Sequence, residues 1–206
     1  MPTQTFFRLP EEKRERLIEA AWREFSEAPF ADVSINRIIR EAQIPRGSFY
    51  QYFGGKEDLF FHLLNTLRED FFALIETAMA RGGGDPFRGT LAMFELVFQG
   101  SGQVLPSLER AVAVLRRNEN MDVLNMLTEK MRADPQLLEI ASKINWGLLR
   151  RTDDAYVQDV TVLLGFSLVC AAREILSDGA DYAQEHETLK NRLEIIRCGS
   201  GKGETA

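Results

Sequence analysis

Helical spacing of apolar residues runs through almost the whole of this 206-residue chain. Leu17, Ala21 and Phe25, for example, share one face of a helix, because residues four apart lie one above the other. A sustained alternation of apolar and polar residues, which would indicate half-buried strands, is missing, and no Asn-Gly or Asp-Gly pair joins two strand-like runs. The pattern therefore predicts an all-α fold.

Proline and glycine mark where these helices begin and end. Pro10 suits the first turn of a helix, where its missing N–H costs nothing, and Pro29 ends that helix. A glycine pair at 54–55 separates a short helix from a long one that runs from 56 towards 80. Further breaks fall at residues 81–86, 100–102, 134–135, 152–153 and 177–179. This punctuation predicts three short helices, one long helix and five or six more.

Composition and charge are those of an ordinary soluble protein, with 45% hydrophobic and 27% charged residues, which excludes disordered and fibrous classes. The net charge of −6 argues against nonspecific coating of nucleic acid. Residues 1–60 carry nine Lys or Arg against ten Asp or Glu, a net charge of −1, which leaves −5 for the remainder. This difference favours DNA binding by the N-terminal part only when a motif supports it.

Three features bear on the compartment. The cysteines, Cys170 and Cys198, match neither a disulfide framework nor a zinc pattern, which indicates a reducing environment. The charged stretch from Glu11 to Arg16 arrives too early for a secretion signal. The most apolar stretch, residues 160–172, is too short to cross a bilayer core of roughly 30 Å and predicts a buried helix. We therefore expect a cytoplasmic protein without a membrane partner.

Residues 34–59 have the form of a helix-turn-helix, in which a tight turn joins two short helices. Ser34 is suited to cap the first helix, but Arg37 stands where an acidic residue would complete a capping box. Ala42 provides a small residue at the turn, and the second helix covers about residues 45–53. Such a motif predicts DNA binding.

The second helix of this motif is the informative one. Its first turn, Arg46-Gly47-Ser48, offers a long cation, a residue without a side chain and a small hydroxyl, which would let base edges approach closely. Arg46, Ser48 and Gln51 are candidates for base contacts, with Arg suited to guanine and Gln to adenine. Lys56 opposes the dipole of the long helix that it begins, but it is well placed there to meet a phosphate.

The segment resembles the TetR/AcrR family of transcriptional regulators over residues 10–60. The matching positions are Ser34, Ile38, Ala42, Ile44, Gly47, Tyr50, Tyr52, Phe53, Lys56 and Leu59. The resemblance implies that the second motif helix enters the major groove, that Ser34 touches a phosphate, and that Tyr50 and Lys56 hold the DNA backbone. Tyr52 would serve either a phosphate or packing.

Two positions depart from the family pattern. Gln43 replaces the usual turn glycine, and a positive φ there would cost roughly 1 kcal/mol. Pro45 replaces the usual capping Ser or Thr and still fits a first helical turn. The DNA-binding set that we predict is Ser34, Pro45, Arg46, Gly47, Ser48, Tyr50, Gln51, Tyr52 and Lys56.

By the same resemblance, a larger helical domain that binds an effector and forms dimers follows the DNA-binding domain. We expect a DNA-binding domain at 1–56, the effector-binding and dimerisation domain at 57–198, and a disordered tail at 199–206, which is rich in small and polar residues. Large aromatic and Met residues predict a pocket for a small apolar or amphipathic effector, with ordinary core packing as the alternative. These residues are Phe94, Phe98, Met121, Met126, Met131, Trp146 and Phe166.

The helix predicted at 155–176 is apolar on more than one face, and that at 182–196 is amphipathic. The resemblance implies that both pair with their copies in a four-helix interface, whereas a deeply buried helix in a monomer is the alternative. Two heads about 34 Å apart would read a palindromic double-stranded DNA operator together. We therefore expect a homodimeric repressor that an effector releases from its operator.

Two other functions stay open. The same fold could answer to a protein partner or to its own abundance, or the chain could be an all-helical enzyme. For an enzyme there is no positive evidence, because His62 and His186 lie far apart without a ligand pattern and no nucleophile spacing is present. We expect no catalytic residues, no cofactor and no metal site.

Overall fold

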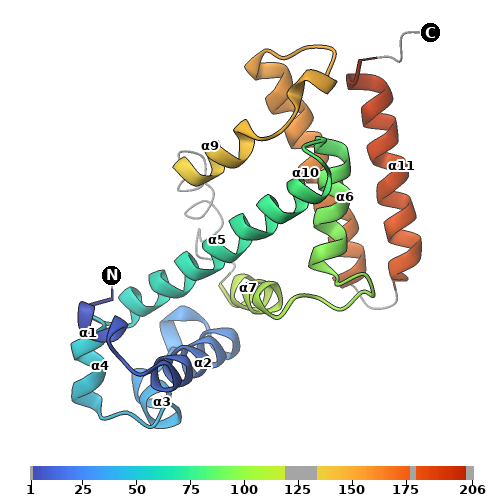
Figure 1. Ribbon diagram of the computed structural model, residues 1–206. Coiled ribbons are helices and arrows are strands. Elements are labelled where there is room, and N and C mark those ends of the chain that lie inside the picture. The colour runs from blue at the N-terminus through green and yellow to red at the C-terminus, as the bar shows by residue number, and fades with distance from the viewer. Residues whose placement is uncertain (1, 119–133, 177–179, 203–206) are drawn as a thin grey trace. The chain divides into compact units, whose positions relative to one another are not determined.

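The computed structural model describes residues 2–118, 134–176 and 180–202, and Figure 1 shows these ranges as helices joined by loops. Within them there is no strand, only an isolated antiparallel bridge between Leu149 and Gly201. The helices are α1 (Gln4–Phe7), α2 (Glu11–Glu27), η1 (Phe30–Asp32), α3 (Ile35–Glu41), α4 (Arg46–Tyr52), α5 (Lys56–Arg81), α6 (Pro86–Val97), α7 (Pro106–Arg117), α9 (Pro135–Ser142), η2 (Trp146–Leu148), α10 (Asp154–Leu176) and α11 (Tyr182–Ser200). The predicted all-α fold is confirmed.

The chain divides into two compact units, which we call the head and the body. The head contains Met1–Asp70 and Pro106–Arg132, and the body contains Phe71–Leu105 and Ala133–Ala206. Helix α5 therefore contributes to both units. The boundary expected after residue 56 falls inside the head, because the first turns of α5 bury apolar side chains such as Leu59 in the core of the head.

Aromatic side chains dominate the core of the head. The ring centroids of Phe25 and Phe60 lie 5.0 Å apart, and those of Phe6 and Phe53 lie 4.9 Å apart. All four side chains are buried and come from different helices or helix ends. Helices of seven residues are marginal by themselves. The shared aromatic core therefore holds the short helices α3 and α4 in place.

Helix α1 was not predicted from the sequence. It is four residues long and has no side-chain cap, so no local signal marks it. Thr3 ties it to α4: its backbone N–H donates to the carbonyl of Tyr52 at 2.9 Å, and its hydroxyl donates to the carbonyl of Gln51 at 2.6 Å. Phe6, fully buried in the core of the head, supplies the apolar contact that the sequence pattern did not reveal.

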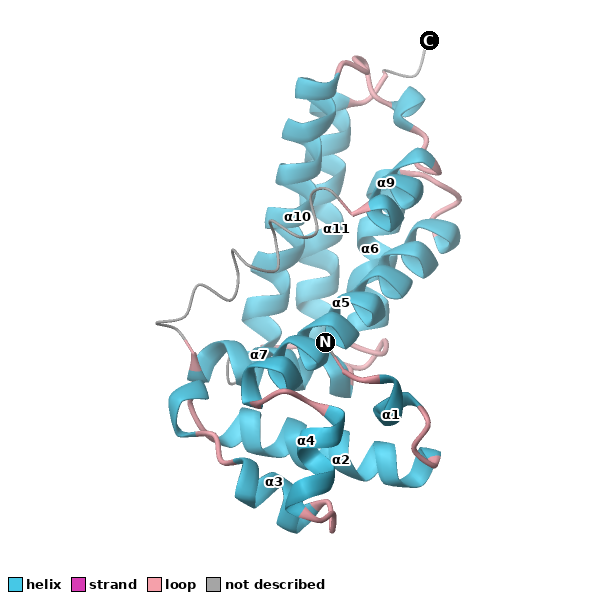
Figure 2. Ribbon diagram, turned by 90° about the vertical axis from the view of Figure 1, so that its left-hand side faces the viewer, coloured by secondary structure: helices cyan, strands magenta, loops and turns pink. Residues whose placement is uncertain are grey.

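In the body, α6, α10 and α11 lie side by side (Figure 1 and Figure 2). The caps at the start of α6 explain its position. Asp85 is buried, and its side chain accepts the backbone N–H of Phe87 at 2.9 Å. The same carboxylate lies 3.1 Å from the guanidinium of Arg197 on α11. One acidic residue therefore both begins α6 and joins it to α11.

The expected disordered tail from residue 199 is wrong for its first residues. Helix α11 continues to Ser200, which is buried. Backbone bonds then follow: Arg150 N–H donates to the carbonyl of Ser200, and Lys202 N–H donates to that of Leu148, both at 2.9 Å. The composition of the tail gave no sign of this partner segment, which lies about fifty residues away. Residues 203–206 lie outside the described residues.

Helix α10 is long and apolar enough, by length and composition, to cross a membrane. One such helix is weak evidence, because core helices of soluble proteins share these properties. One face of α10 packs into the body core through Val160, Leu164 and Ala171. The other face exposes Phe166 and Val169, so the buried helix expected from the sequence is buried on one side only.

Candidate nucleic-acid interface

The helix-turn-helix consists of α3, the turn at residues 42–45 and α4. Ser34 caps α3 as predicted, because its hydroxyl accepts the backbone N–H of Arg37, although the distance of 3.4 Å is long. Gln43 has a φ of +54°, so the turn does place a residue other than glycine in the left-handed region. That conformation costs about 1 kcal/mol. Ala42 is fully buried beneath the turn.

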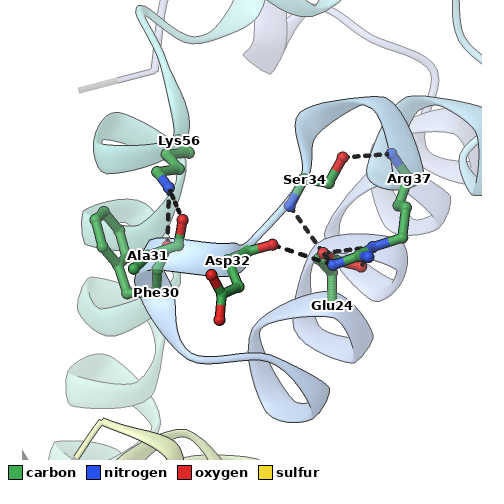
Figure 3. Close-up of polar contacts among 7 residues, drawn as sticks. All are labelled: Glu24, Phe30, Ala31, Asp32, Ser34, Arg37 and Lys56. Atoms are coloured by element: carbon green, nitrogen blue, oxygen red, sulfur yellow. Dashed lines mark hydrogen bonds and ion pairs between the residues drawn. The ribbon is translucent and has the colours of Figure 1, made fainter.

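The cap of α3 is completed from another helix (Figure 3). Glu24 of α2 accepts the backbone N–H of Ser34 at 2.8 Å. The Nε of Arg37 lies 2.8 Å from both carboxylate oxygens of Glu24, and its Nη2 also donates to the carbonyl of Asp32 at 3.1 Å. Burial would raise the pKa of Glu24, but the hydrogen bonds from Arg37 and Ser34 and the Arg37 charge together lower it. Glu24 was missed from the sequence, although the incomplete capping box at Arg37 was a signal.

Lys56, predicted to meet a phosphate, is partly committed within the head (Figure 3). Its ammonium donates to the carbonyls of Phe30 and Ala31, both at 2.9 Å, and lies 4.9 Å from the ring centroid of Phe30. An ammonium has three N–H donors, so one is left for a phosphate. Lys56 therefore ties η1 to the start of α5, and its phosphate contact stays a prediction.

Helix α4 has one buried and one exposed face. Phe49 and Tyr52 are buried in the core of the head, whereas Arg46, Tyr50 and Gln51 are exposed. Tyr52, which we placed among the DNA-binding residues, is 8% exposed and packs in the core. The spacing of Phe49 and Tyr52, three apart on one helix face, could have indicated this from the sequence.

The remaining predicted residues lie at or near this exposed face. Pro45 is the exposed N-cap of α4, Gly47 is exposed and Ser48 is half-buried. Arg46 Nη1 donates to Oδ1 of Asn36 on α3 at 3.0 Å. Asn36 is exposed and was missed, because its only signal is a polar side chain in the first motif helix.

Gly47 has no intramolecular reason to be glycine. Its φ is not positive, and a Cβ added to its backbone would meet no atom within 4 Å. Ala is the better helix former, by about 1 kcal/mol in a helix interior and by less at the second residue of a helix such as Gly47. A glycine on an exposed helix face, where the described residues leave space for a side chain, fits a surface that another molecule approaches closely.

Of the residues expected to form an effector pocket, those that the structure describes lie partly in the body core and partly on its surface. Phe94 and Phe98 are fully buried with ring centroids 4.8 Å apart, and Trp146 packs against the same core cluster. Phe166 is 67% exposed on α10, on the face turned away from the body core. Met121, Met126 and Met131 lie outside the described residues.

A shallow cavity of about 580 Å³ that is open to solvent lies beside this cluster in the body. Its lining residues are Arg81, Glu95, Leu96, Gln99, Gly100, Leu105 and Tyr182. Tyr182 stacks on Phe94 with ring centroids 5.6 Å apart, so the predicted aromatic residue forms the second layer of the cavity wall. His186 Nε2 pairs with Glu95 at 2.9 Å. The cavity thus combines apolar walls with charged and amide groups.

Comparison with known proteins agrees with this geometry in the head. Residues 17–63 match the family model described as bacterial regulatory proteins, tetR family. The HTH-type transcriptional regulator HbdR of Aromatoleum sp. (strain CIB) is 39% identical over 64 residues, which are 31% of this chain and 28% of that protein. The uncharacterized HTH-type transcriptional regulator YdgC of Bacillus subtilis (strain 168) is 34% identical over 91 residues, 43% of this chain and 47% of that protein. The matches thus cover less than half of these curated relatives.

Solved structures match over nearly the whole length. A TetR family transcriptional regulator from Chloroflexus aurantiacus J-10-FL has a TM-score of 0.55 and 25% identity over 98% of this chain and 99% of that one. A TetR family transcription regulator from Marinobacter aquaeolei VT8 has a TM-score of 0.61 and 17% identity, over 93% and 97% of the two chains, and shows the fold alone. The head of the chain thus matches the tetR family of bacterial regulatory proteins, and its fold is that of solved TetR family transcriptional regulators.

Proposed function

We propose that this chain is a cytoplasmic, homodimeric repressor that binds a palindromic DNA operator through α3 and α4 and is released by a small effector. The observation that carries the proposal is the exposed face of α4. Arg46 and Gln51 present base-reading groups there, and Gly47 leaves room between them for close approach of a groove. Tyr50 lies beside them and is 48% exposed, so its hydroxyl could contact a phosphate of the DNA backbone.

An exposed apolar stripe on α10 supports the dimer. Val162, Leu163, Phe166 and Val169 are each at least half exposed, and they lie on the face opposite the body core. Apolar side chains that recur at this spacing on an exposed helix face favour a second apolar surface. In a two-fold dimer the same stripe would cover its own copy.

The cavity beside Tyr182 supports the proposal that the body binds a small effector. Its volume of about 580 Å³ lies within the usual range for small-molecule sites, which is about 300–1,000 Å³. Leu96 and Leu105 would contact an apolar part of the ligand, and Arg81 and Gln99 a polar part. An amphipathic compound therefore suits this site better than a wholly apolar one. Binding would shift the population towards a spacing of the two heads that no longer fits the operator.

Selection from random duplex DNA by the purified protein tests the DNA-binding function. We expect a palindrome to be enriched, with half-sites about one helical turn apart. Binding of the enriched duplex is then compared between the wild-type chain and Tyr50→Ala. Failure of the wild type to enrich any duplex would contradict the proposal, as would undiminished affinity of several variants of the exposed α4 face.

Gly47→Ala sharpens this test. The added methyl group meets no atom of the described residues within 4 Å, so the thermal midpoint should stay equal or rise. Affinity for the enriched duplex should fall about tenfold or more, because the methyl group stands where a base edge would approach. Gly199→Ala is the matched control, since Gly199 is also helical, exposed and without neighbours within 4 Å. Equal DNA affinity in both variants would remove Gly47 from the interface.

A further inference from the structure

We propose that Glu24 is a positioning residue for DNA binding: it caps α3 from the neighbouring helix and thereby fixes how the helix-turn-helix sits on α2. The inference rests on the proposed function, because it concerns the surface that would read the operator. Glu24 is 7% exposed, and its carboxylate points at the start of α3 (Figure 3). A buried carboxylate in an otherwise apolar face of α2 needs strong partners to be tolerated.

Its partners are the two groups that begin α3. In an ordinary capping box, the acidic residue three positions after the cap accepts the N–H of the cap residue. Arg37 holds that position here, and Glu24 accepts the N–H of Ser34 in its place. The other half of the box is local, since the Ser34 hydroxyl accepts the N–H of Arg37. The cap of α3 is therefore complete only when α2 and α3 are docked.

The side chain of Arg37 adds direction to this contact. Its guanidinium bonds both carboxylate oxygens of Glu24, and it reaches the carbonyl of Asp32 just before α3. Such two-pronged pairs define an orientation as well as a distance. A cap within one helix leaves that helix free to rotate on its neighbour, whereas this one restrains both rotation and sliding. Because the short turn at Gln43 joins α3 directly to α4, fixing the orientation of α3 also fixes that of α4.

The same contacts determine what Arg37 does. Three of its N–H donors are used within the head, and its charge is balanced by a buried carboxylate at hydrogen-bond distance. Hydrogen bonding to Glu24 raises the pKa of Arg37, and the pKa of Glu24 is lowered, so the pair stays ionised at neutral pH. Arg37 thus fixes the orientation of α3 on α2, although a basic side chain in this motif would by itself suggest a phosphate contact.

The double variant Glu24→Met with Arg37→Glu separates capping from positioning. The carboxylate introduced at position 37 completes an ordinary capping box with Ser34, and Met fills the buried position on α2 without a polar group. We expect a cooperative unfolding transition within a few degrees of the wild type, because the cap is kept. The ratio of affinities for the enriched and the random duplex should fall about tenfold, because α4 is no longer held in register. The ratio also corrects for the charge change, which both duplexes sense.

Arg37→Lys provides a second, independent variant. It keeps the positive charge and the local cap but replaces the planar fork by a single point. We expect a fall of about threefold in the same affinity ratio, with little change in the thermal midpoint. This variant decides the matter if the double variant does not fold. An affinity ratio equal to that of the wild type in a folded double variant, or in Arg37→Lys when the double variant is unfolded, would overturn the role of Glu24. A wild-type chain that enriches no duplex would instead overturn the proposed function, and the inference would fall with it.

Discussion

The head and the body differ in how far polar contacts at helix ends position their helices. In the head, charged side chains bond to backbone groups at helix ends: Glu24 to the start of α3, and Lys56 to the carbonyls of η1. In the body, Asp85 caps α6 in the same way, but the long helices α10 and α11 pack against α6 through an apolar core around Phe94 and Phe98, and a cavity and an exposed stripe remain. Short helices must be positioned by their ends, whereas long helices are positioned by their faces. This difference agrees with the proposed function, in which the head presents one fixed surface to DNA and the body binds a small effector.

The comparison of head and body predicts the largest loss of stability for replacement of a buried aromatic residue of the head. Phe53→Ala should lower the free energy of unfolding by about 3–5 kcal/mol, because the ring is fully buried and contacts Phe6, Phe49 and His62. Denaturant unfolding followed by circular dichroism measures the change. A loss below about 1 kcal/mol would mean that the aromatic core does not hold the head together.

The exposed phenylalanine of the body should behave in the opposite way. Phe166→Ala removes a side chain that is 67% exposed, so folding within one chain should change little. If the α10 stripe is the dimer interface, the dissociation constant should rise about 30-fold, equivalent to ~2 kcal/mol. Sedimentation velocity over a dilution series measures it, with Leu138→Ala as the matched control, since Leu138 is also exposed but lies on α9. An unchanged monomer–dimer equilibrium would place the interface elsewhere.

Asp85 is the one buried charged residue among the described residues of the body, and its replacement tests how much this polar anchor contributes. Asp85→Ala removes the cap of α6 and leaves Arg197 without this carboxylate, and should cost about 2 kcal/mol in free energy of unfolding. Asp85→Asn keeps the cap and loses the charge, so about half of that loss is expected. Equal losses in the two variants, measured by urea unfolding, would show that the ion pair dominates and that the cap contributes little.

Replacement of Lys56 tests whether this residue stabilises the head, contacts DNA, or does both. Lys56→Met keeps the stem of the side chain but loses the bonds to the two η1 carbonyls, and should cost about 1 kcal/mol of stability. If its third donor meets a phosphate, the slope of log affinity against log salt also falls by about one. Arg46→Ala should instead relax base preference with little loss of stability. A Lys56→Met variant with an unchanged salt slope would make Lys56 an anchor only.

The smallest effect concerns acidity in the head. Burial lowers the pKa of His62 below its usual 6.5, so the unfolded chain binds a proton more readily than the folded one. The stability contribution is full above pH 6.5 and is lost as the pH falls from there towards the lowered value. Between about pH 7.5 and about pH 5.5, the thermal midpoint should therefore fall further for the wild type than for His62→Gln. A steeper fall for the variant would contradict this sign.

Much of the fold was set by local sequence. The start of α5 at Lys56 and the Ser34 cap follow from glycine and capping residues, whose effects reach only a few positions along the chain. The same local rules explain why α4 and its exposed Arg46 could be predicted. Helix formation and capping depend on neighbours within about four residues, which the sequence displays directly.

The tertiary structure alone decided which partners these residues have. Glu24 meets α3 because two helices dock, Lys56 turns towards η1, and Phe166 faces outward although its residue type suggested a pocket. The end of α11 is held by a segment around Leu149 that its own composition does not indicate. Such contacts join positions ten to fifty residues apart, and a single sequence specifies them only through the packing of the whole unit.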